Sequence, residues 1–238
     1  ALADKLETLV GMFGIGQIPT GDRDPFALRR HALGIIRMLS EGDLNLPLNE
    51  LLTAATQAFS GIEGFKPAES ALADFIYDRL AGSLREQGYT AQEVDAVVSQ
   101  RPQRLGDIPK RLAAVRAFSA LPEAAALAAA NKRVGNILKK IEDSVEAWVD
   151  SSLLSEAAEI SLHAALGDVV PQADAAFLTG DYSASLQALA ALRAPVDVFF
   201  NDVMVNVDDP TIRANRLGLL AKLHLAMNQV ADISKLST

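Results

Sequence analysis

The chain of 238 residues contains no cysteine. This absence excludes disulfides, thiolate metal sites and cysteine nucleophiles, and it agrees with a reducing compartment. Aromatic residues make up only 5% of the chain although half of its residues are apolar, with many Ala and Leu. Such a mixture is typical of packed helices rather than sheets. The sequence therefore predicts an all-α protein.

Long apolar runs are missing as well. No run approaches the roughly 20 residues that would span a bilayer, and the first ten residues lack the basic start and cleavage site of a signal peptide. We therefore expect a cytoplasmic location and no membrane partner. The chain also begins inside a helical pattern without an initiator Met, which predicts a piece of a longer protein.

Positive charge is scarce overall, because the net charge is -8, but it is concentrated. Residues 104–140 hold 8 basic and 2 acidic side chains, whereas residues 141–209 hold 1 and 13. Residues 1–103 hold 9 and 14, and residues 210–238 hold 4 and 1. This distribution predicts anion-facing surfaces in 104–140 and near the end of the chain.

Apolar periodicity and capping signals divide the chain into helices. The predicted helices cover 2–13, 25–41, 47–59, 68–87, 90–100, 108–120, 122–149, 153–166, 172–179, 182–192, 195–205 and 210–230. Thr90 and Glu93 have the spacing of a capping box. Because the charge profile and the periodicity both change near Leu121-Pro122, we expect two packed helical units, 1–121 and 122–238.

No complete catalytic motif is present. The spacing of Gly11, Gly14, Gly16 and Gly21 fits no phosphate-binding loop. The three histidines, His31, His163 and His224, fall on separate predicted helices without a metal-binding partner at i+4. We therefore expect neither catalytic nor metal-binding residues in this chain.

A row of basic side chains is the clearest functional signal. A helical projection of 131–145 gathers polar residues on one face about 120° wide, opposite an apolar face. These residues are Lys132, Arg133, Asn136, Lys139 and Lys140. Four cations around an amide suit a phosphate backbone, so we predict RNA binding; the alternative is a solvated face that pairs with the acidic segment.

Arg216 in the last predicted helix falls on the face that must be buried. A buried arginine needs a partner, and the expected candidates are Asp197, Asp202, Asp208 and Asp209. We therefore predict a structural ion pair for Arg216. Arg213 and Lys222 lie nearer the polar side and are predicted to reach RNA.

Several stretches resemble, in order, the C-terminal part of the β subunit of bacterial glycyl-tRNA synthetase. They read ALADKLETLVGMFGIGQIPTGDRDPFALRRHALGIIR, DFIYDRL with REQGY, AANKRVGNILKK, and APVDVFFNDVMVNVDDPTIRANRLGLLAKL. The resemblance implies that residues from about Ala126 onward form the helical anticodon-binding domain shared with arginyl-tRNA synthetases. Its opening helix pattern matches Arg133, Ile137, Leu138, Lys139 and Lys140, and its Arg-x-x-Arg-Leu pattern matches Arg213, Arg216 and Leu217.

The first part of the chain resembles the end of an HD-type helical domain. There Asp4 matches the closing Asp of a metal-binding set whose other members would precede Ala1, so no metal site is complete here. The resemblance further implies that the catalytic centre, with its ATP and Mg²⁺, lies on a separate α subunit.

The resemblance thus implies the tRNA(Gly)-binding and assembly region of a glycine-tRNA ligase, an aminoacyl-tRNA synthetase, without a cofactor of its own. It would support ATP-dependent aminoacylation on the α subunit. The alternatives are a remnant of an HD-type metal-dependent phosphohydrolase and a helical scaffold whose acidic 141–209 region faces a basic protein.

Overall fold

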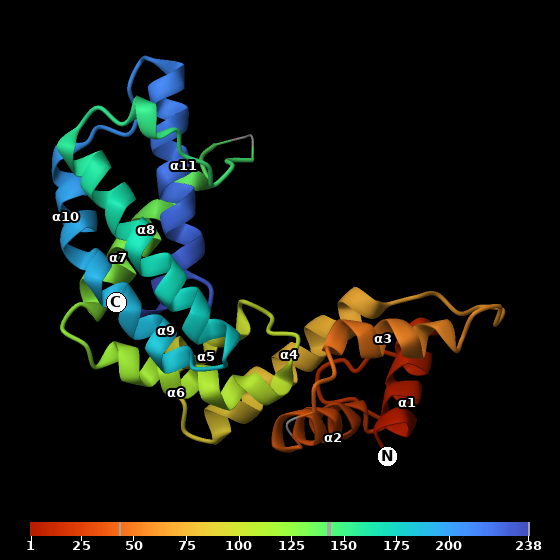
Figure 1. Ribbon diagram of the computed structural model, residues 1–238. Helices are drawn as coiled ribbons and strands as arrows, with labels where there is room; N and C mark the ends of the chain where they lie inside the picture. Colours follow the sequence, from red (N-terminus) through yellow and green to blue (C-terminus); the bar gives the residue numbers. More distant parts are fainter. Residues whose placement is uncertain (43, 142–143, 238) are drawn as a thin grey trace. The chain divides into compact units, whose positions relative to one another are not determined.

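The computed structural model describes residues 1–42, 44–141 and 144–237, and these residues form helices and loops without a β-strand (Figure 1). The all-α prediction is therefore confirmed. The chain divides into two compact units. The N-terminal unit comprises 1–94 and 101–109, and the C-terminal unit comprises 95–100 and 110–238. The boundary between the two units thus lies near Pro109, whereas the charge profile predicted a boundary after Leu121.

Four helices build most of the N-terminal unit. They are α1 (Leu2–Gly14), α2 (Leu28–Glu41), α3 (Leu48–Gln57) and α4 (Glu69–Glu86), followed by the start of α5 (Ala91–Val98) and the 3₁₀ turn Leu105–Asp107. Their apolar faces share one core, in which Leu9, Ile35, Leu39 and Ile76 are completely buried. The capping box that begins α5 is confirmed, since the backbone N–H of Glu93 donates to Thr90 Oγ1 over 3.2 Å.

Helix α2 begins later than predicted. Ala27 has φ 52°, in the left-handed region, and this interrupts the helix expected from Pro25 onward. Asp24 nevertheless caps the helix, because its carboxylate accepts the backbone N–H groups of Leu28 at 2.8 Å and Arg29 at 3.0 Å. The predicted start at Pro25 is therefore wrong and the N-cap is Ala27, although the Asp24 carboxylate accepts two N–H groups of the first turn.

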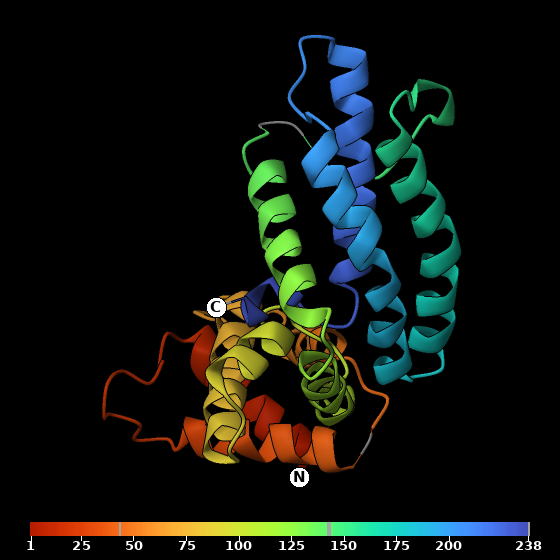
Figure 2. The same cartoon turned by 90° about the vertical axis from the view of Figure 1, so that its left-hand side faces the viewer.

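The C-terminal unit is a helical bundle. It contains α6 (Ile108–Ser119) from Lys110 onward, α7 (Ala124–Leu138), α8 (Ala157–Leu178), α9 (Tyr182–Ala188), α10 (Arg193–Asp202), α11 (Pro210–Met227), and the 3₁₀ turns Ser151–Leu153, Leu189–Leu192 and Ile233–Leu236. Figure 2 shows α7, α8, α10 and α11 side by side. Their shared core includes Leu127, Leu162, Phe199 and Leu220, all completely buried.

Arg111 fastens α6 to the rest of this unit. Its guanidinium carbon lies 5.3 Å from the ring centre of Phe177 and 4.8 Å from that of Tyr182. The same side chain donates to the carbonyl oxygens of Gln229 at 3.2 Å and Val230 at 2.7 Å. Two carbonyl groups and two ring faces thus contact this buried guanidinium, whereas its Nε has no hydrogen-bond partner among the described residues.

Two further predictions of helix boundaries are wrong. Helix α8 runs unbroken through Pro171, where two helices were expected. Proline leaves the carbonyl of Gly167 without its helical partner, but both residues are solvent-exposed, so water can satisfy that oxygen. Helix α7 ends at Leu138 instead of Val149, and residues 144–150 are not helical. Residues 142–143 of the predicted helix lie outside the described residues.

Across the described residues, no single helix is long and apolar enough to cross a membrane. One bent pair, Leu105–Ser119 with Ala124–Leu138, meets that criterion of length and composition when taken together.

Candidate nucleic-acid interface

Helix α7 is anchored to α11 by its buried side. Asn131 is completely buried and exchanges two amide hydrogen bonds with Asn228, at 2.9 and 3.0 Å. One turn further along α7, Gly135 faces His224, whose Nε2 would lie 3.4 Å from an added Cβ. The two helices are therefore antiparallel and close. This fixes which side of α7 faces solvent.

The five predicted contact residues lie on that solvent side. Each of them is exposed: Lys132, Arg133, Asn136, Lys139 and Lys140. Lys139 and Lys140 follow the end of the helix but continue its winding, because their backbone N–H groups still bond to Gly135 at 3.0 Å and Ile137 at 3.2 Å. The predicted row, hereafter the α7 basic row, is therefore one continuous surface although the helix is shorter than expected.

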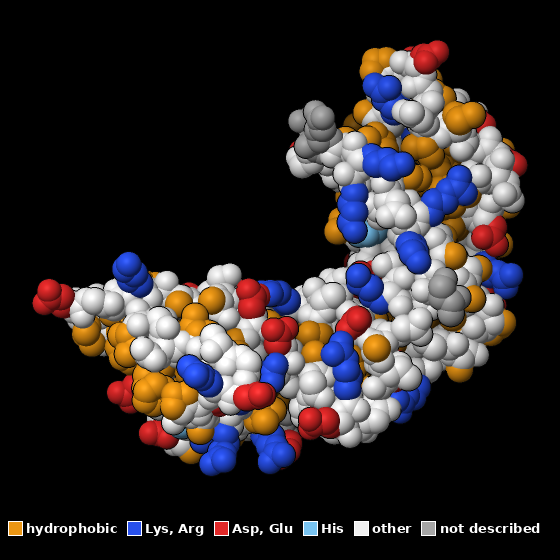
Figure 3. Space-filling view, turned by 180° about the vertical axis from the view of Figure 1, so that it is seen from behind, with side chains coloured by type: hydrophobic (Ala, Val, Ile, Leu, Met, Phe, Trp, Pro, Cys, Tyr) orange, Lys and Arg blue, Asp and Glu red, His pale blue; other side chains and the backbone are white. Residues whose placement is uncertain are grey.

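Carboxylates do not neutralise the lysines of this row within the part of the chain that the structure describes. Arg133 has a different neighbour, since its guanidinium carbon lies 4.1 Å from the ring centre of Phe200 on α10. Stacking on a ring orients the guanidinium and leaves its N–H groups free to donate at the rim. Figure 3 shows Lys and Arg side chains gathered on one face of the C-terminal unit.

The α7 basic row affects the pKa of a neighbouring histidine, His224. Burial lowers the pKa of His224, the charge of Asp232 raises it, and the charge of Lys139 lowers it again, with a net lowering. His224 is thus favoured in its neutral form. It adds no cation to the row near neutral pH.

The two other predicted contact residues, Arg213 and Lys222, are half-buried on α11. Helix α11 begins as expected, because Asp209 accepts the backbone N–H groups of Thr211 at 2.8 Å and Ile212 at 3.2 Å. Arg213 lies in the first turn of the helix, and Lys222 lies about two and a half turns later. The structure therefore puts both on a helix packed against α7.

Arg216 is buried and paired, but its partners are not those expected. Its Nε donates to Glu159 over 2.7 Å, its Nη2 donates to Glu156 over 2.7 Å, and its Nη1 donates to the carbonyl of Met204 over 2.7 Å. The prediction that Asp197, Asp202, Asp208 or Asp209 would pair with it is wrong. Asp197 instead lies 3.7 Å from Arg193, and Asp209 caps α11. Arg216 therefore holds α11 to the start of α8.

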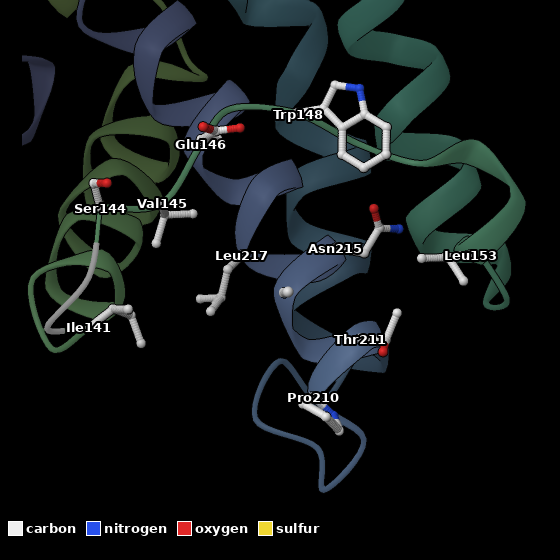
Figure 4. Close-up of a pocket in the computed structure, with 11 residues that line it drawn as sticks. Ile141, Ser144, Val145, Glu146, Trp148, Leu153, Pro210, Thr211, Asn215 and Leu217 are labelled. Atoms are coloured by element: carbon white, nitrogen blue, oxygen red, sulfur yellow. The ribbon is translucent and has the colours of Figure 1, made fainter.

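The structure has a pocket of about 590 Å³ beside the α7 basic row, which the sequence did not predict. Its lining is drawn in Figure 4 and comprises Ile141, Ser144, Val145, Glu146, Trp148, Leu153, Pro210, Thr211, Ala214, Asn215 and Leu217. Trp148, the single tryptophan of the chain, is 66% exposed there. Because a helix was predicted through Val149, the non-helical segment that lines part of this pocket was not expected. Gly218 was an available signal, because it allows the chain at Trp148 to cross α11 closely.

No group of three or more His, Asp or Glu side chains that could hold a metal occurs among the residues that the structure describes. Asp4, which matched the closing Asp of an HD-type set, is exposed on α1. The relation of the N-terminal unit to HD domains remains a prediction.

Comparisons with known proteins agree with this geometry. A family model described as glycyl-tRNA synthetase beta subunit matches residues 1–99, and one described as DALR anticodon binding domain matches residues 127–237. The two matches leave 100–126 between them, a stretch that contains the 3₁₀ turn Leu105–Asp107, α6 and the start of α7.

Curated relatives match over the whole chain. The glycine–tRNA ligase beta subunit of Dechloromonas aromatica (strain RCB) is 83% identical over 237 residues, which are 100% of this chain and 33% of that protein. The subunits of Janthinobacterium sp. (strain Marseille) and Methylobacillus flagellatus are 68% and 62% identical, again over 100% of this chain and 34% of each protein. The chain spans about a third of the length of these relatives. It belongs to the glycyl-tRNA synthetase β subunit family, with a DALR anticodon-binding domain at residues 127–237.

Proposed function

We propose that the C-terminal unit binds the anticodon stem and loop of tRNA(Gly) through the α7 basic row and the exposed parts of Arg213 and Lys222. The observation that carries the proposal is the row itself. Four cations and one amide lie exposed on one side of α7, inside the match to an anticodon-binding domain. A rigid helix with this spacing of charges can follow a phosphate backbone.

The role of this surface is to position the tRNA. Lysine and arginine contacts to phosphates would orient the stem, and Asn136 would contact a base edge or a ribose. In this proposal the chain is part of a glycine-tRNA ligase whose α subunit carries ATP, Mg²⁺ and the aminoacylation chemistry. The chain then supports catalysis through tRNA binding and through assembly with that subunit.

A salt series on the full-length ligase tests the proposal. Lys132→Glu, Lys139→Glu and Lys140→Glu are combined in one variant, and the affinity for tRNA(Gly) is measured at several salt concentrations. Each lost phosphate contact should lower the slope of log affinity against log salt by about 0.7 to 0.9. We expect the combined variant to lose about two units of slope and most of its affinity.

A matched variant controls for the change in net charge. Arg30, Arg37 and Lys66 are three exposed cations of the N-terminal unit, and changing all three to Glu alters the net charge equally. If this control weakens tRNA binding as much as the α7 variant does, the α7 basic row is not the binding surface. Far-ultraviolet circular dichroism of both variants verifies that the helices are retained.

A further inference from the structure

We infer that the pocket beside Trp148 receives one unpaired base of the bound RNA, with the indole as its stacking surface. The inference rests on the proposed function and adds a specificity-determining residue to it. Figure 4 shows Trp148, Asn215 and Thr211 along one side of the pocket and Ile141, Ser144 and Val145 along the other, with Leu217 of α11 between them.

The backbone around Trp148 is held firmly although its side chain is exposed. Asn215 accepts the backbone N–H of Asp150 over 2.8 Å and donates to the carbonyl of the same residue over 3.1 Å. The carbonyl oxygen of Trp148 would lie 2.1 Å from a Cβ added to Gly218, so the chain passes directly over α11 at its glycine. The indole is therefore presented to solvent from a fixed point. A preorganised aromatic surface of this kind loses little entropy when a ring stacks on it.

The charges around the pocket favour a base inside it and phosphates at its margins. Among the lining residues that the structure describes, Glu146 alone is charged, and its carboxylate repels a phosphate. Two cations are neighbours of the lining in the chain, because Lys140 precedes the lining residue Ile141 and Arg213 precedes the lining residue Ala214. An RNA strand that crosses from one cation to the other would bring its base over the indole.

The size of the pocket suits this occupant. Its volume of about 590 Å³ lies within the range of about 300 to 1,000 Å³ that is usual for small-molecule and cofactor sites, so one base can enter it. An exposed tryptophan is itself unusual, because the large apolar surface of an indole is normally covered in a folded protein or in its complexes. The neighbouring α7 basic row makes RNA the partner that fits both surfaces at once.

The test uses the full-length ligase and an anticodon stem-loop RNA of tRNA(Gly), together with a series in which each loop nucleotide in turn is abasic. Trp148→Ala should weaken binding of the intact loop about tenfold, which is the usual effect of losing one base stack. Trp148→Phe, which keeps an aromatic face, should bind within about threefold of the original protein. One abasic position should weaken binding to the original protein and leave binding to Trp148→Ala unchanged.

Two controls separate stacking from a general disturbance. Leu178 is 83% exposed at the end of α8, and Leu178→Ala should leave the affinity unchanged. The slope of log affinity against log salt should be the same for Trp148→Ala as for the original protein, because stacking releases no counterions. A lowered slope would indicate that the substitution disturbs the α7 basic row.

The outcomes distinguish the two proposals. If the original ligase binds RNA with the expected salt dependence but Trp148→Ala binds equally well, the base pocket is refuted and the proposed function stands. If Trp148→Ala alters the assembly state of the ligase without altering RNA affinity, the pocket is a protein contact and the inference is wrong. If binding ignores both salt and the α7 charge reversals, the proposed function fails and the base pocket fails with it.

Discussion

The ion pair of Arg216 predicts unequal effects for its two glutamates. Glu159 is bonded at 2.7 Å with a side chain that is 1% exposed, whereas Glu156 is bonded at the same distance with a side chain that is 42% exposed. Removing the charge of Glu159 leaves a buried guanidinium without its main counterion. Breaking a buried pair in this way costs about 3 to 5 kcal/mol, whereas an exposed pair contributes at most about 1 kcal/mol.

Glu159→Gln should therefore destabilise the C-terminal unit by about 3 kcal/mol, which corresponds to a fall of about 6 to 12 °C in Tm. Glu156→Gln is the matched control and should cost no more than about 1 kcal/mol. Urea unfolding followed by circular dichroism at 222 nm measures both. Equal losses from the two variants, or a loss below about 1 kcal/mol for Glu159→Gln, would refute the reasoning, since the cost is attributed to burial.

The pH dependence provides an independent measurement of the same pair. Burial raises the pKa of Glu159, but the hydrogen bonds from Arg216 and from the backbone lower it by more than burial raises it. The pKa therefore lies below its ordinary value of 4.5. The ionised form is therefore favoured by folding. Its contribution is present above about pH 4.5 and is lost as the pH falls through the lowered pKa. Glu159→Gln should lose this part of the acid dependence.

Two further predictions concern α11. Gly218→Ala should destabilise the C-terminal unit by about 1 to 3 kcal/mol because its Cβ would overlap the Trp148 carbonyl, whereas Gly167→Ala on α8 meets nothing within 4 Å and should stabilise it by about 0.5 to 1 kcal/mol. Urea unfolding of both variants tests this difference in sign. Burial lowers the pKa of His224 below 6.5; the charge of Asp232 opposes this shift, and the charge of Lys139 adds to it. The free energy of unfolding should therefore fall as the pH drops below about 6.5. His224→Gln should remove that fall, as measured by Tm between pH 5 and pH 7.

Local signals in the sequence predicted much of the fold. Asp209 before a proline and Thr90 three residues before Glu93 define helix starts because the cap and the N–H groups that it satisfies are neighbours in sequence. The α7 basic row was predicted for the same reason. A helical projection needs only the local period, and the exposed residues lie where that period puts them.

The wrong predictions concern features that depend on contacts between residues far apart in the sequence. The carboxylates that pair with Arg216 lie 57 and 60 positions away, and residues near it in sequence were the natural but wrong candidates. Helix α7 ends early at Leu138, and the chain after it crosses α11 at Gly218, a contact between residues that are 70 positions apart. The Trp148 pocket depends on that crossing. It therefore could not be predicted together with a continuous helix.

The acidic segment explains how a chain with a net charge of -8 can present a basic surface. Several of its carboxylates have structural partners: Glu156 and Glu159 hold Arg216, while Asp181 and Asp209 cap helices. These groups are fixed at helix starts, and Glu159 is also buried in the bundle. Because salt screens charges beyond about 8 Å at physiological ionic strength, a phosphate at α7 responds to the nearby cations more than to the total charge. The segregation seen in the sequence therefore favours a local anion-binding surface on an acidic protein.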